Sequence, residues 1–517
     1  MKENTVNNKK KVVIVGAGVS GLAAGIYLCD NGYDVEIYEK HDIPGGECTG
    51  WVREGQYIDG CAHWIIGTNP NSQLYPLWEH VGAFKNTRIY KTEALASFDL
   101  GNGESFFFGC DLNKLEKELL EMSPKDKRAI RSFVRTIEAY TRTNIPVKKP
   151  LDHMNIFELM VFGLQMLPMA IPFAKYRKVT VKEYAKRFKD PRIGRFLTRF
   201  MGEEYNMHSL FYVLQSFLTD NAGITEGGSV KFVMRMVNTF KEAGGKLFLS
   251  SPTEKIVLEG NRTTGIQLEN GSFIPADYVI CTADVHHTFT KLLPNELMPR
   301  FFKDRFEQKS AYPIRTAFQL SWQTTADLDE KPRMMDFEID PVDLCGTKVD
   351  CFALRNFSFD KSLSRNHKTL LTALIPVGEI TYDNLAALSR EDYLAKKQEI
   401  GEYFTRLVSE RVGIPMDCLK LLDVASPLTY NRYANAYKGS YMSFIITEKS
   451  KGLMIGNRLK GVKNLLLSGQ WLMPPGGLPV ALFTGKHAAY NVCYLDKKKF
   501  INKEKIKGGG FLKARVA

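Results

Sequence analysis

The sequence predicts an α/β fold in which a parallel, dinucleotide-binding sheet is interleaved with an α+β domain. Residues 12–15 (VVIV) form a short apolar run that is followed at once by a glycine-rich turn and by helical apolar spacing. Apolar strands and helical patterns alternate again at 226–281 and 464–493, so the first domain is discontinuous. Between these parts, 112–217 is typical of helices and 312–377 of a mostly antiparallel sheet.

The glycine-rich turn gives the clearest chemical signal. Residues 11–40 read KVVIVGAGVSGLAAGIYLCDNGYDVEIYEK, with strand, turn, helix, second strand and a terminal acid in the order of a dinucleotide fingerprint. Gly16 permits the tight turn, Gly18 lets the backbone approach a pyrophosphate, and Gly21 lets the helix pack closely on the strand. Glu39 is placed to bind the ribose of an adenosine and would repel a 2′-phosphate, which argues against NADP. This pattern alone leaves NAD and FAD open.

The later strands and helices follow from the same patterns. We expect a helix from about residue 230, a strand at 246–250, a hairpin across 259–261 and one further strand at 273–281. A long helix is expected over 386–413. Near the C-terminus, a buried strand at 465–467 leads into a proline-glycine turn and a helix from about Pro479.

Composition restricts the class of protein. Of the 517 residues, 44% are hydrophobic and 25% are charged, which is typical of globular proteins. The net charge of +13 lies mostly at the ends, because residues 497–517 hold eight Lys or Arg and one acid, and residues 1–11 hold four Lys and one acid. This distribution does not suggest a nucleic-acid-binding face. For the basic tail 497–517, a solvated chain and an anchor on an anionic membrane are the two interpretations.

The cysteines and the N-terminus indicate a reducing compartment. The nine cysteines lack disulfide or CxxC spacing, and the nine histidines are scattered, so we expect no metal. The N-terminus shows no secretory signal pattern. We therefore expect a cytoplasmic protein, with a peripheral position on the inner face of the membrane as the alternative.

An apolar segment stands out within the helical region. Residues 156–174 read IFELMVFGLQMLPMAIPFA, with basic residues before and after them. Glu158, Pro168 and Pro172 argue against a membrane-spanning helix. Two interpretations stay open: an element that dips into one leaflet, and a buried helix of the second domain.

Several motifs together resemble the FAD-dependent phytoene desaturase family, which includes carotenoid isomerases and retinol saturases, and more distantly the flavin amine oxidases. They are the glycine-rich turn with Glu39, PGG at 44–46, EGGS at 226–229, SPLT at 426–429, and LSGQW at 467–471 with PGGLP at 475–479. The resemblance implies a Rossmann-type FAD-binding domain interleaved with an α+β substrate domain of mixed sheet and helices. It implies an FAD-binding domain made of residues 1–100, 218–300 and 455–496. The substrate domain would consist of 101–217 and 301–454, with the apolar segment 154–174, and 497–517 would form a basic tail.

The resemblance also implies cofactor contacts, and FAD as the cofactor. The glycine-rich turn would hold the pyrophosphate, Glu39 the ribose, the backbone of Thr253 the adenine, and Gly469 with Gln470 the ribityl chain or pyrophosphate. A helix N-terminus at residues 478–480 would face the carbonyl end of the flavin and stabilise its reduced, anionic form. The predicted cofactor residues are Gly16, Gly18, Val19, Ser20, Gly21, Glu39, Lys40, Gly45, Gly46, Thr253, Gly469, Gln470, Leu478, Pro479 and Val480.

Two residues depart from the family pattern. Many relatives carry a basic residue after the paired glycines, whereas this chain has Glu47, which would repel the pyrophosphate unless it points away or pairs with Arg53. An acid often found at the ribityl position is replaced by Gln470, which forms hydrogen bonds but carries no charge. Both departures suggest a branch whose substrate differs from those of the named carotenoid enzymes.

The predicted reaction is dehydrogenation of carbon–carbon bonds in a long apolar isoprenoid or polyene lipid. Because the chain has one dinucleotide fingerprint, we expect a quinone, oxygen or a soluble carrier as the electron partner. His63, Arg315 and Tyr441 are the candidate catalytic polar groups near the flavin. Four alternatives stay open: a saturase, a cis–trans isomerase that uses reduced FAD, an amine oxidase, and a non-catalytic apolar-ligand carrier with a structural flavin.

Overall fold

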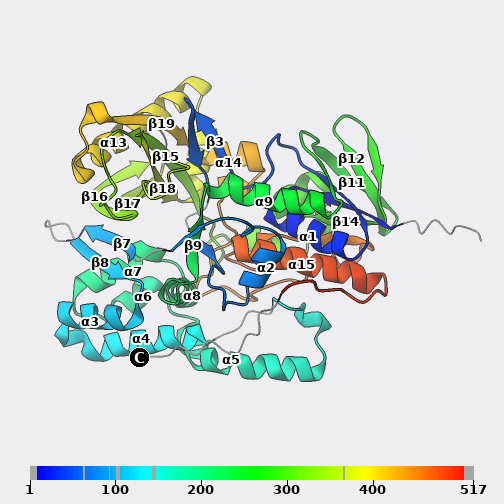
Figure 1. Cartoon of the computed structure of the whole chain (residues 1–517), viewed down its shortest axis with the longest axis horizontal. Coiled ribbons are helices and arrows are strands. Elements are labelled where there is room, and N and C mark those ends of the chain that lie inside the picture. The colour runs from blue at the N-terminus through cyan, green and yellow to red at the C-terminus, as the bar shows by residue number, and fades with distance from the viewer. Residues whose placement is uncertain are drawn as a thin grey trace, which may run out of the picture.

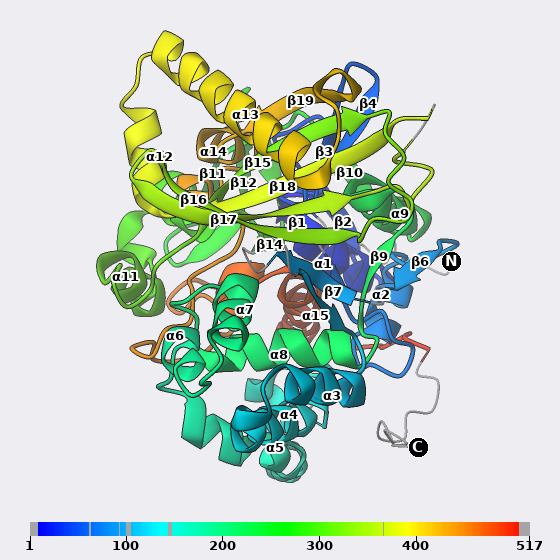
Figure 2. The same cartoon turned by 90° about the vertical axis from the view of Figure 1, so that its left-hand side faces the viewer.

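The computed structural model describes residues 9–61, 64–91, 94–99, 105–142, 147–364 and 367–505. Figures 1 and 2 show a central parallel sheet with helices against it, a second and larger sheet beside it, and a group of helices below both. The predicted α/β class with an interleaved α+β part is confirmed.

The central sheet is five-stranded and parallel. Its order is β10 (Lys246–Phe248), β2 (Asp34–Tyr38), β1 (Lys11–Val15), β14 (Tyr278–Cys281) and β20 (Leu465–Leu467). Alternate residues of β1 are buried in two different cores, one on each face of the sheet. Val12 and Ile14 belong to the core shared with α1 (Val19–Asp30), α9 (Gly228–Glu242) and α15 (Leu478–Leu495), whereas Val13 and Val15 belong to the core on the opposite face. Burial on both faces explains why this strand is apolar throughout.

A three-stranded antiparallel sheet lies on that opposite face. It consists of β11 (Thr253–Glu259), β12 (Arg262–Leu268) and β13 (Phe273–Pro275), and the first two form the predicted hairpin. The prediction of one strand at 273–281 is wrong, because β13 pairs in this small sheet and β14 pairs in the central sheet. The chain passes from one layer to the other at residues 276–277.

The larger sheet has seven strands. Their order is β19 (Leu419–Ala425), β15 (Thr316–Thr324), β18 (Thr369–Val377), β17 (Thr347–Asn356), β16 (Met334–Leu344), β7 (Ala94–Asp99) and β8 (Ser105–Gly109). The strands from β15 to β18 pair antiparallel, as predicted, and α13 (Arg390–Val412) packs on the sheet through a shared core. β7 lies within the range 1–100 predicted for the FAD-binding domain, yet it pairs with β16, so the chain enters the second domain before residue 100.

Helices fill the region between β8 and β9, as the sequence predicts. They are α3 (Leu112–Met122), α4 (Lys127–Thr141), α5 (Ile156–Tyr176), α6 (Val181–Ala185), α7 (Pro191–Met201) and α8 (Met207–Leu218). α5 lies along the lower edge of the molecule (Figure 1). Among the described residues it is the one helix whose length and composition would allow it to cross a membrane, and none of its apolar window is buried in the protein.

The remaining elements connect these layers. They are β3 (Gly50–Arg53), β4 (Gln56–Asp59), β5 (Ile65–Ile66), α2 (Tyr75–His80), β6 (Ile89–Lys91), β9 (Ala222–Thr225), α10 (Val285–His287), α11 (Arg300–Glu307), α12 (Glu379–Ala386) and α14 (Pro427–Ala434). Residues 497–505 follow the surface of the protein, with most of their side chains exposed. They lie against α1 and α15, where Glu504 accepts a hydrogen bond from Tyr27 Oη at 2.6 Å and pairs with Lys486 Nζ at 2.6 Å.

Candidate functional site

The glycine-rich turn lies between β1 and α1, at the carboxyl edge of the central sheet, where ligands of such sheets bind. Gly16 has a φ of +101°, which favours glycine. A Cβ at Gly21 would lie 2.1 Å from the carbonyl oxygen of Gly16, so turn and helix approach too closely for any side chain there. α1 begins after Gly18 with no side-chain cap and no acid in its first turn, which leaves Val19 and Ser20 at a positive helix end.

A second pair of glycines packs against this turn. The Gly45 N–H donates to the carbonyl of Ala17 at 2.9 Å, and Gly45 forms a bridge with Gly18. A Cβ at Gly46 would lie 3.5 Å from Gly18 Cα. The two glycine segments therefore lie side by side, and their contact with a cofactor stays a prediction.

The residues predicted to bind the adenosine lie at the end of β2 and at the start of β11. Glu39 is buried at the end of β2 and accepts hydrogen bonds from the N–H groups of Ala17 at 2.8 Å and His41 at 3.0 Å. Lys40 donates instead to Asn435 Oδ1 at 2.6 Å, next to α14, so its ammonium ties two parts of the chain together. Thr253 begins β11, and its Oγ1 is a buried polar atom without a hydrogen-bond partner among the described residues.

The C-terminal motif closes the site from the other side. Ser468 Oγ lies 2.6 Å from Ser20 Oγ, which places residues 468–470 at the start of α1. The Gly469 N–H donates to Thr484 Oγ1 at 3.1 Å. α15 begins after Gly477 with no side-chain cap and no acid in its first turn, so Leu478, Pro479 and Val480 form a second uncapped helix N-terminus, as predicted.

Glu47 joins these two loops. Gln470 Nε2 donates to Glu47 Oε2 at 2.6 Å, and Gln470 Oε1 accepts from the Gly477 N–H at 3.0 Å. Burial of the carboxyl group, with a smaller contribution from the nearby carboxylate of Asp284, raises the pKa of Glu47 to about 8. The carboxyl group is therefore protonated at neutral pH. Pairing with Arg53 is not what the structure shows, because Arg53 pairs with Asp423 at 3.1 Å.

Sequence reasoning missed a buried polar cluster where the two domains meet. Asp59 accepts from Ser229 N at 2.6 Å and from Ser229 Oγ at 2.8 Å. Gln319 Nε2, on β15, donates to the carbonyl of Asp59 at 2.6 Å, and Tyr430 Oη donates to Gln319 Oε1 at 2.9 Å. Burial raises the pKa of Asp59 and lowers that of Arg355 to about 10, and each charge partly opposes the shift of the other.

A local signal for this cluster exists in the sequence. Asp59 precedes Gly60, and Ser229 follows Gly227 and Gly228, so two glycine-containing turns flank the two polar groups. A Cβ at Gly228 would lie 2.0 Å from Asp59 Oδ2, which explains why glycine is required there. Gln319, Tyr430 and Arg355 come from distant strands and helices, and nothing near them in sequence indicates that they meet.

The structure describes two of the three predicted catalytic residues. His63 lies outside the described residues. Arg315 pairs with Glu204, and its carbonyl accepts from the Tyr441 N–H at 3.3 Å. Ser443 N donates to the carbonyl of Pro475 at 3.0 Å, so Arg315 and Tyr441 lie beside the loop that leads into α15. Their contact with a substrate stays a prediction.

Burial acts on both of these groups. It lowers the pKa of the Arg315 guanidinium and raises the pKa of the Tyr441 phenol. The phenol is therefore neutral at physiological pH. Beside the loop that leads into α15 lie a guanidinium that is ion-paired with Glu204 and a neutral hydroxyl, which suits orientation of a ligand more than proton abstraction.

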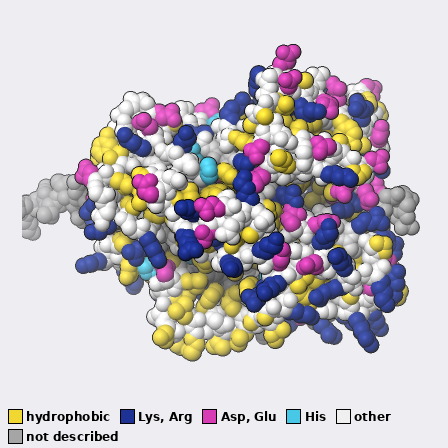
Figure 3. Space-filling model, turned by 180° about the vertical axis from the view of Figure 1, so that it is seen from behind, with side chains coloured by type: hydrophobic (Ala, Val, Ile, Leu, Met, Phe, Trp, Pro, Cys, Tyr) yellow, Lys and Arg dark blue, Asp and Glu magenta, His cyan; other side chains and the backbone are white. Residues whose placement is uncertain are grey.

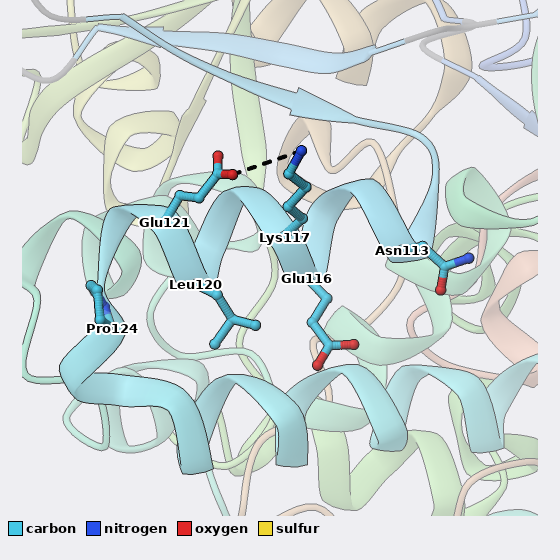
Figure 4. Close-up of a pocket in the computed structure, with 6 residues that line it drawn as sticks. All are labelled: Asn113, Glu116, Lys117, Leu120, Glu121 and Pro124. Atoms are coloured by element: carbon cyan, nitrogen blue, oxygen red, sulfur yellow. Dashed lines mark ion pairs between the residues drawn. The ribbon is translucent and has the colours of Figure 1, made fainter.

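Metal ligands and surface hollows also bear on the site. Within the described ranges, no group of three or more His, Cys, Asp or Glu side chains is arranged to hold a metal ion. A surface hollow of about 520 Å³ lies along α3, lined by Asn113, Glu116, Lys117, Leu120, Glu121 and Pro124 (Figure 4). Lys117 already faces Glu121 at 3.8 Å, and these residues have no contact with the glycine loops, so this hollow belongs to a different surface.

The residues at the carboxyl edge fit FAD. Two uncapped helix N-termini, on α1 and α15, offer backbone N–H groups to anionic and electron-rich atoms. The paired glycine segments provide close backbone approach, and the buried Thr253 Oγ1 lacks a partner at the adenosine end. Glu47 is hydrogen-bonded to Gln470, and burial raises the pKa of its carboxyl group, which favours the neutral form at this edge.

Comparisons with known proteins identify relatives along most of the chain. The family model for flavin containing amine oxidoreductases matches residues 19–493. A zeta-carotene-forming phytoene desaturase of Myxococcus xanthus is 27% identical over 299 residues, and the match spans 55% of this chain and 55%, about half, of that relative's length. A 4,4′-diapophytoene desaturase (4,4′-diapolycopene-forming) of a Methylomonas species is 22% identical over 519 residues, which cover 95% of this chain and 97% of that protein.

A solved structure supports the architecture. The crystal structure of an oxidoreductase from Methanosarcina mazei has a TM-score of 0.59 to this chain, with 18% identity, and covers 92% of this chain and 99% of that one. At this identity the similarity shows the fold alone. Together with the family match, these findings confirm the resemblance that the motifs indicated.

Proposed function

The chain belongs to the family of flavin-containing amine oxidoreductases, with FAD as cofactor, and from this premise we propose that it dehydrogenates carbon–carbon bonds of a long apolar lipid. The substrate class is an isoprenoid or polyene. The observation that carries the proposal is the match to a diapophytoene desaturase over 95% of this chain, because it spans both the cofactor domain and the substrate domain.

The residues at the site support this chemistry. When bound, FAD supplies the two-electron oxidant that C–H dehydrogenation requires. The N-termini of α1 and α15 would bind and orient the anionic and electron-rich atoms of FAD, and burial raises the pKa of Glu47, which favours the neutral form of its carboxyl group. Such a reaction depends on alignment and on exclusion of water more than on a strong base. Arg315 and Tyr441 are suited to positioning the substrate beside the loop before α15.

The partners follow from this chemistry. A quinone, oxygen or a soluble carrier would take the electrons, since the sequence has one dinucleotide fingerprint. An apolar substrate resides in membranes, so we include peripheral contact with a membrane, from the cytoplasmic side, in the proposal. The exposed apolar surface of α5 supports this contact.

Amine oxidation is the second candidate. It is favoured by the description of the matched family, which names amine oxidoreductases. A saturase or an isomerase would use the same cofactor site with a different electron balance. Amine-dependent formation of peroxide would support the amine oxidase, and turnover of a polyene without any acceptor would support the isomerase.

The test is an anaerobic titration of the purified, FAD-loaded protein with polyenes, isoprenoids and fatty acids in detergent micelles. Bleaching of the flavin absorbance band at about 450 nm by one lipid would support dehydrogenation and identify the substrate class. A flavin that no lipid reduces, but that one lipid reoxidises after chemical reduction, would replace dehydrogenation by saturation. Absence of any bound flavin after purification and reconstitution would overturn the proposal.

A further inference from the structure

α5 exposes an unusually large apolar surface. Ile156 is 88% exposed, Phe157 65% and Ile171 79%, and four more large apolar side chains of the helix are 42–58% exposed: Leu159, Met160, Leu164 and Leu167. Figure 3 shows hydrophobic side chains gathered along the lower edge of the molecule, where α5 lies. Contiguous apolar surface of this kind marks an interaction site in soluble proteins.

Both ends of α5 are fixed to the body of the protein. At its N-terminus, Asn155 and Glu158 form a capping box, Lys149 pairs with Glu158 at 2.7 Å, and the preceding His153 packs on Tyr494 of α15 at 4.3 Å. At its C-terminal end, Phe173 stacks on His208 of α8 at 4.4 Å. A helix held at both ends against the protein lies along the surface, so it presents its side to a neighbour and does not leave the body to span a bilayer.

A row of arginines adjoins the C-terminal end of α5. Arg128, Arg131 and Arg135 are exposed and follow one another at three- and four-residue spacing, so they share one face of α4. Together with Ser132, Thr136 and Pro172 of α5 they line a hollow of about 490 Å³. Figure 3 shows Lys and Arg side chains gathered at the lower right, beside the apolar edge.

The arginine row retains most of its charge for a ligand. Arg131 lies 3.6 Å from Glu116, whereas Arg128 and Arg135 form no ion pair with any acid that the structure describes. Lys175, in the last turn of α5, lies over the ring of Tyr176 at 5.0 Å and adds another cation next to the hollow. Three guanidinium groups around one hollow match the geometry and charge of a phosphate group.

We propose that the hollow between α4 and α5 binds the phosphate of an anionic phospholipid, while α5 lies in the plane of the same leaflet with its apolar side chains among the acyl chains. This rests on the membrane contact in the proposed function and adds the lipid class and the residues that select it. An anionic lipid matches both features of this surface, because its phosphate suits the arginine row and its acyl chains suit the apolar side of α5.

The test compares binding of the full-length, FAD-loaded protein to vesicles of phosphatidylcholine and of phosphatidylcholine with phosphatidylglycerol, measured by co-sedimentation. The combined variant Arg128→Ala, Arg131→Ala, Arg135→Ala should bind the anionic vesicles on the order of 100-fold more weakly, since each basic residue near an anionic leaflet contributes about a factor of five. The control, Arg390→Ala, Lys397→Ala, Arg406→Ala, removes three charges from α13 and should bind as the unchanged protein does. Phe157→Ser with Ile171→Ser should weaken binding to both kinds of vesicle.

Three results would overturn the proposal. They are equal binding to neutral and anionic vesicles, unchanged binding of the arginine variant, and a lipid-free dimer in analytical ultracentrifugation that Phe157→Ser with Ile171→Ser dissociates. Flavin bleaching by lipid substrates in detergent micelles is measured on the same variants. A failure of vesicle binding with normal bleaching would therefore disprove the headgroup site and the membrane contact but not the proposed reaction, and loss of bleaching in all proteins with normal vesicle binding would disprove the proposed reaction alone.

Discussion

Glu47 shows how an acid is accommodated where relatives often carry a base. The charge pattern of the sequence predicts repulsion from a pyrophosphate, yet the side chain is hydrogen-bonded to Gln470 and burial raises the pKa of its carboxyl group to about 8. The two departures from the family pattern, Glu47 and Gln470, thus form one neutral pair. The sequence motifs single out both residues but not their contact, because 423 positions separate them.

Replacement of Glu47 by Gln tests this protonation state. In the unfolded chain a glutamate ionises near pH 4.3, whereas folded Glu47 holds its proton up to about pH 8. Between these values the folded state binds one more proton than the unfolded state, so this residue lowers stability as the pH rises from about 4 to about 8. Glu47→Gln removes the effect, and its Tm relative to the unchanged protein should rise between pH 5 and pH 8.5 in thermal unfolding. The control is Glu54→Gln, because Glu54 is an exposed ion-pair partner of Lys420. If the difference in Tm from the unchanged protein varies with pH in the same way for both variants, the prediction is contradicted.

Gly21 tests the cofactor turn. A Cβ there would lie 2.1 Å from the Gly16 carbonyl oxygen, a backbone atom that cannot move without opening the turn. Gly21→Ala should weaken FAD binding by about 10- to 100-fold, which corresponds to about 1–3 kcal/mol of overpacking, measured by quenching of flavin fluorescence. Gly163→Ala is the matched control, because no atom lies within 4 Å of a Cβ placed at Gly163 in the exposed helix α5. Equal affinities of the two variants would show that the turn is not at the cofactor.

The sequence predicts the position of single strands and helices well. It does not predict the layer of the fold to which each of them belongs. The run at 12–15 could be assigned to a buried strand because apolar residues face both sides of the central sheet. The residues 273–281 look equally continuous, yet they contribute to two sheets, since pairing partners decide the layer. The sequence identifies α5 as apolar. Because the helix is apolar on all sides, its sequence does not indicate which side the protein covers.

The segment 497–505 illustrates the same limit. Its basic composition is typical of a solvated tail, but one acid, Glu504, reaches the buried ammonium of Lys486 at 2.6 Å and accepts from Tyr27 Oη. Glu504→Gln should lower the free energy of unfolding by about 3–5 kcal/mol in a denaturant titration, because it leaves Lys486 buried without a counter-charge. Lys486→Met combined with Glu504→Gln should recover most of that loss. If the single and double variants are equally unstable, the ion pair is not what holds this segment.

The two domains form one unit through contacts that no local pattern reveals. β7 enters the seven-stranded sheet beside β16, 238 positions away at the pair Met335 and Ser97, and Gln319 of β15 binds the carbonyl of Asp59 across the domain junction. The sequence predicted two interleaved domains because helical and strand patterns alternate in blocks. It could not predict the boundary near residue 94 or the junction cluster, because both depend on which distant strands pair.

The junction cluster should couple the unfolding of the two domains. The Asp59 carboxylate accepts hydrogen bonds from Ser229, at the start of α9, and from the Cys61 N–H at 3.0 Å, and its negative charge favours the charged form of buried Arg355. Asp59→Ala should therefore release FAD at a lower temperature than that at which hydrogen exchange of the β15 amides reports unfolding of the larger sheet, whereas both transitions should coincide in the unchanged protein. Asp329→Ala, which removes an exposed partner of Lys361, is the control and should leave the two transitions together. Coincident transitions in Asp59→Ala would mean that the shared apolar packing, and not this cluster, makes the molecule cooperative.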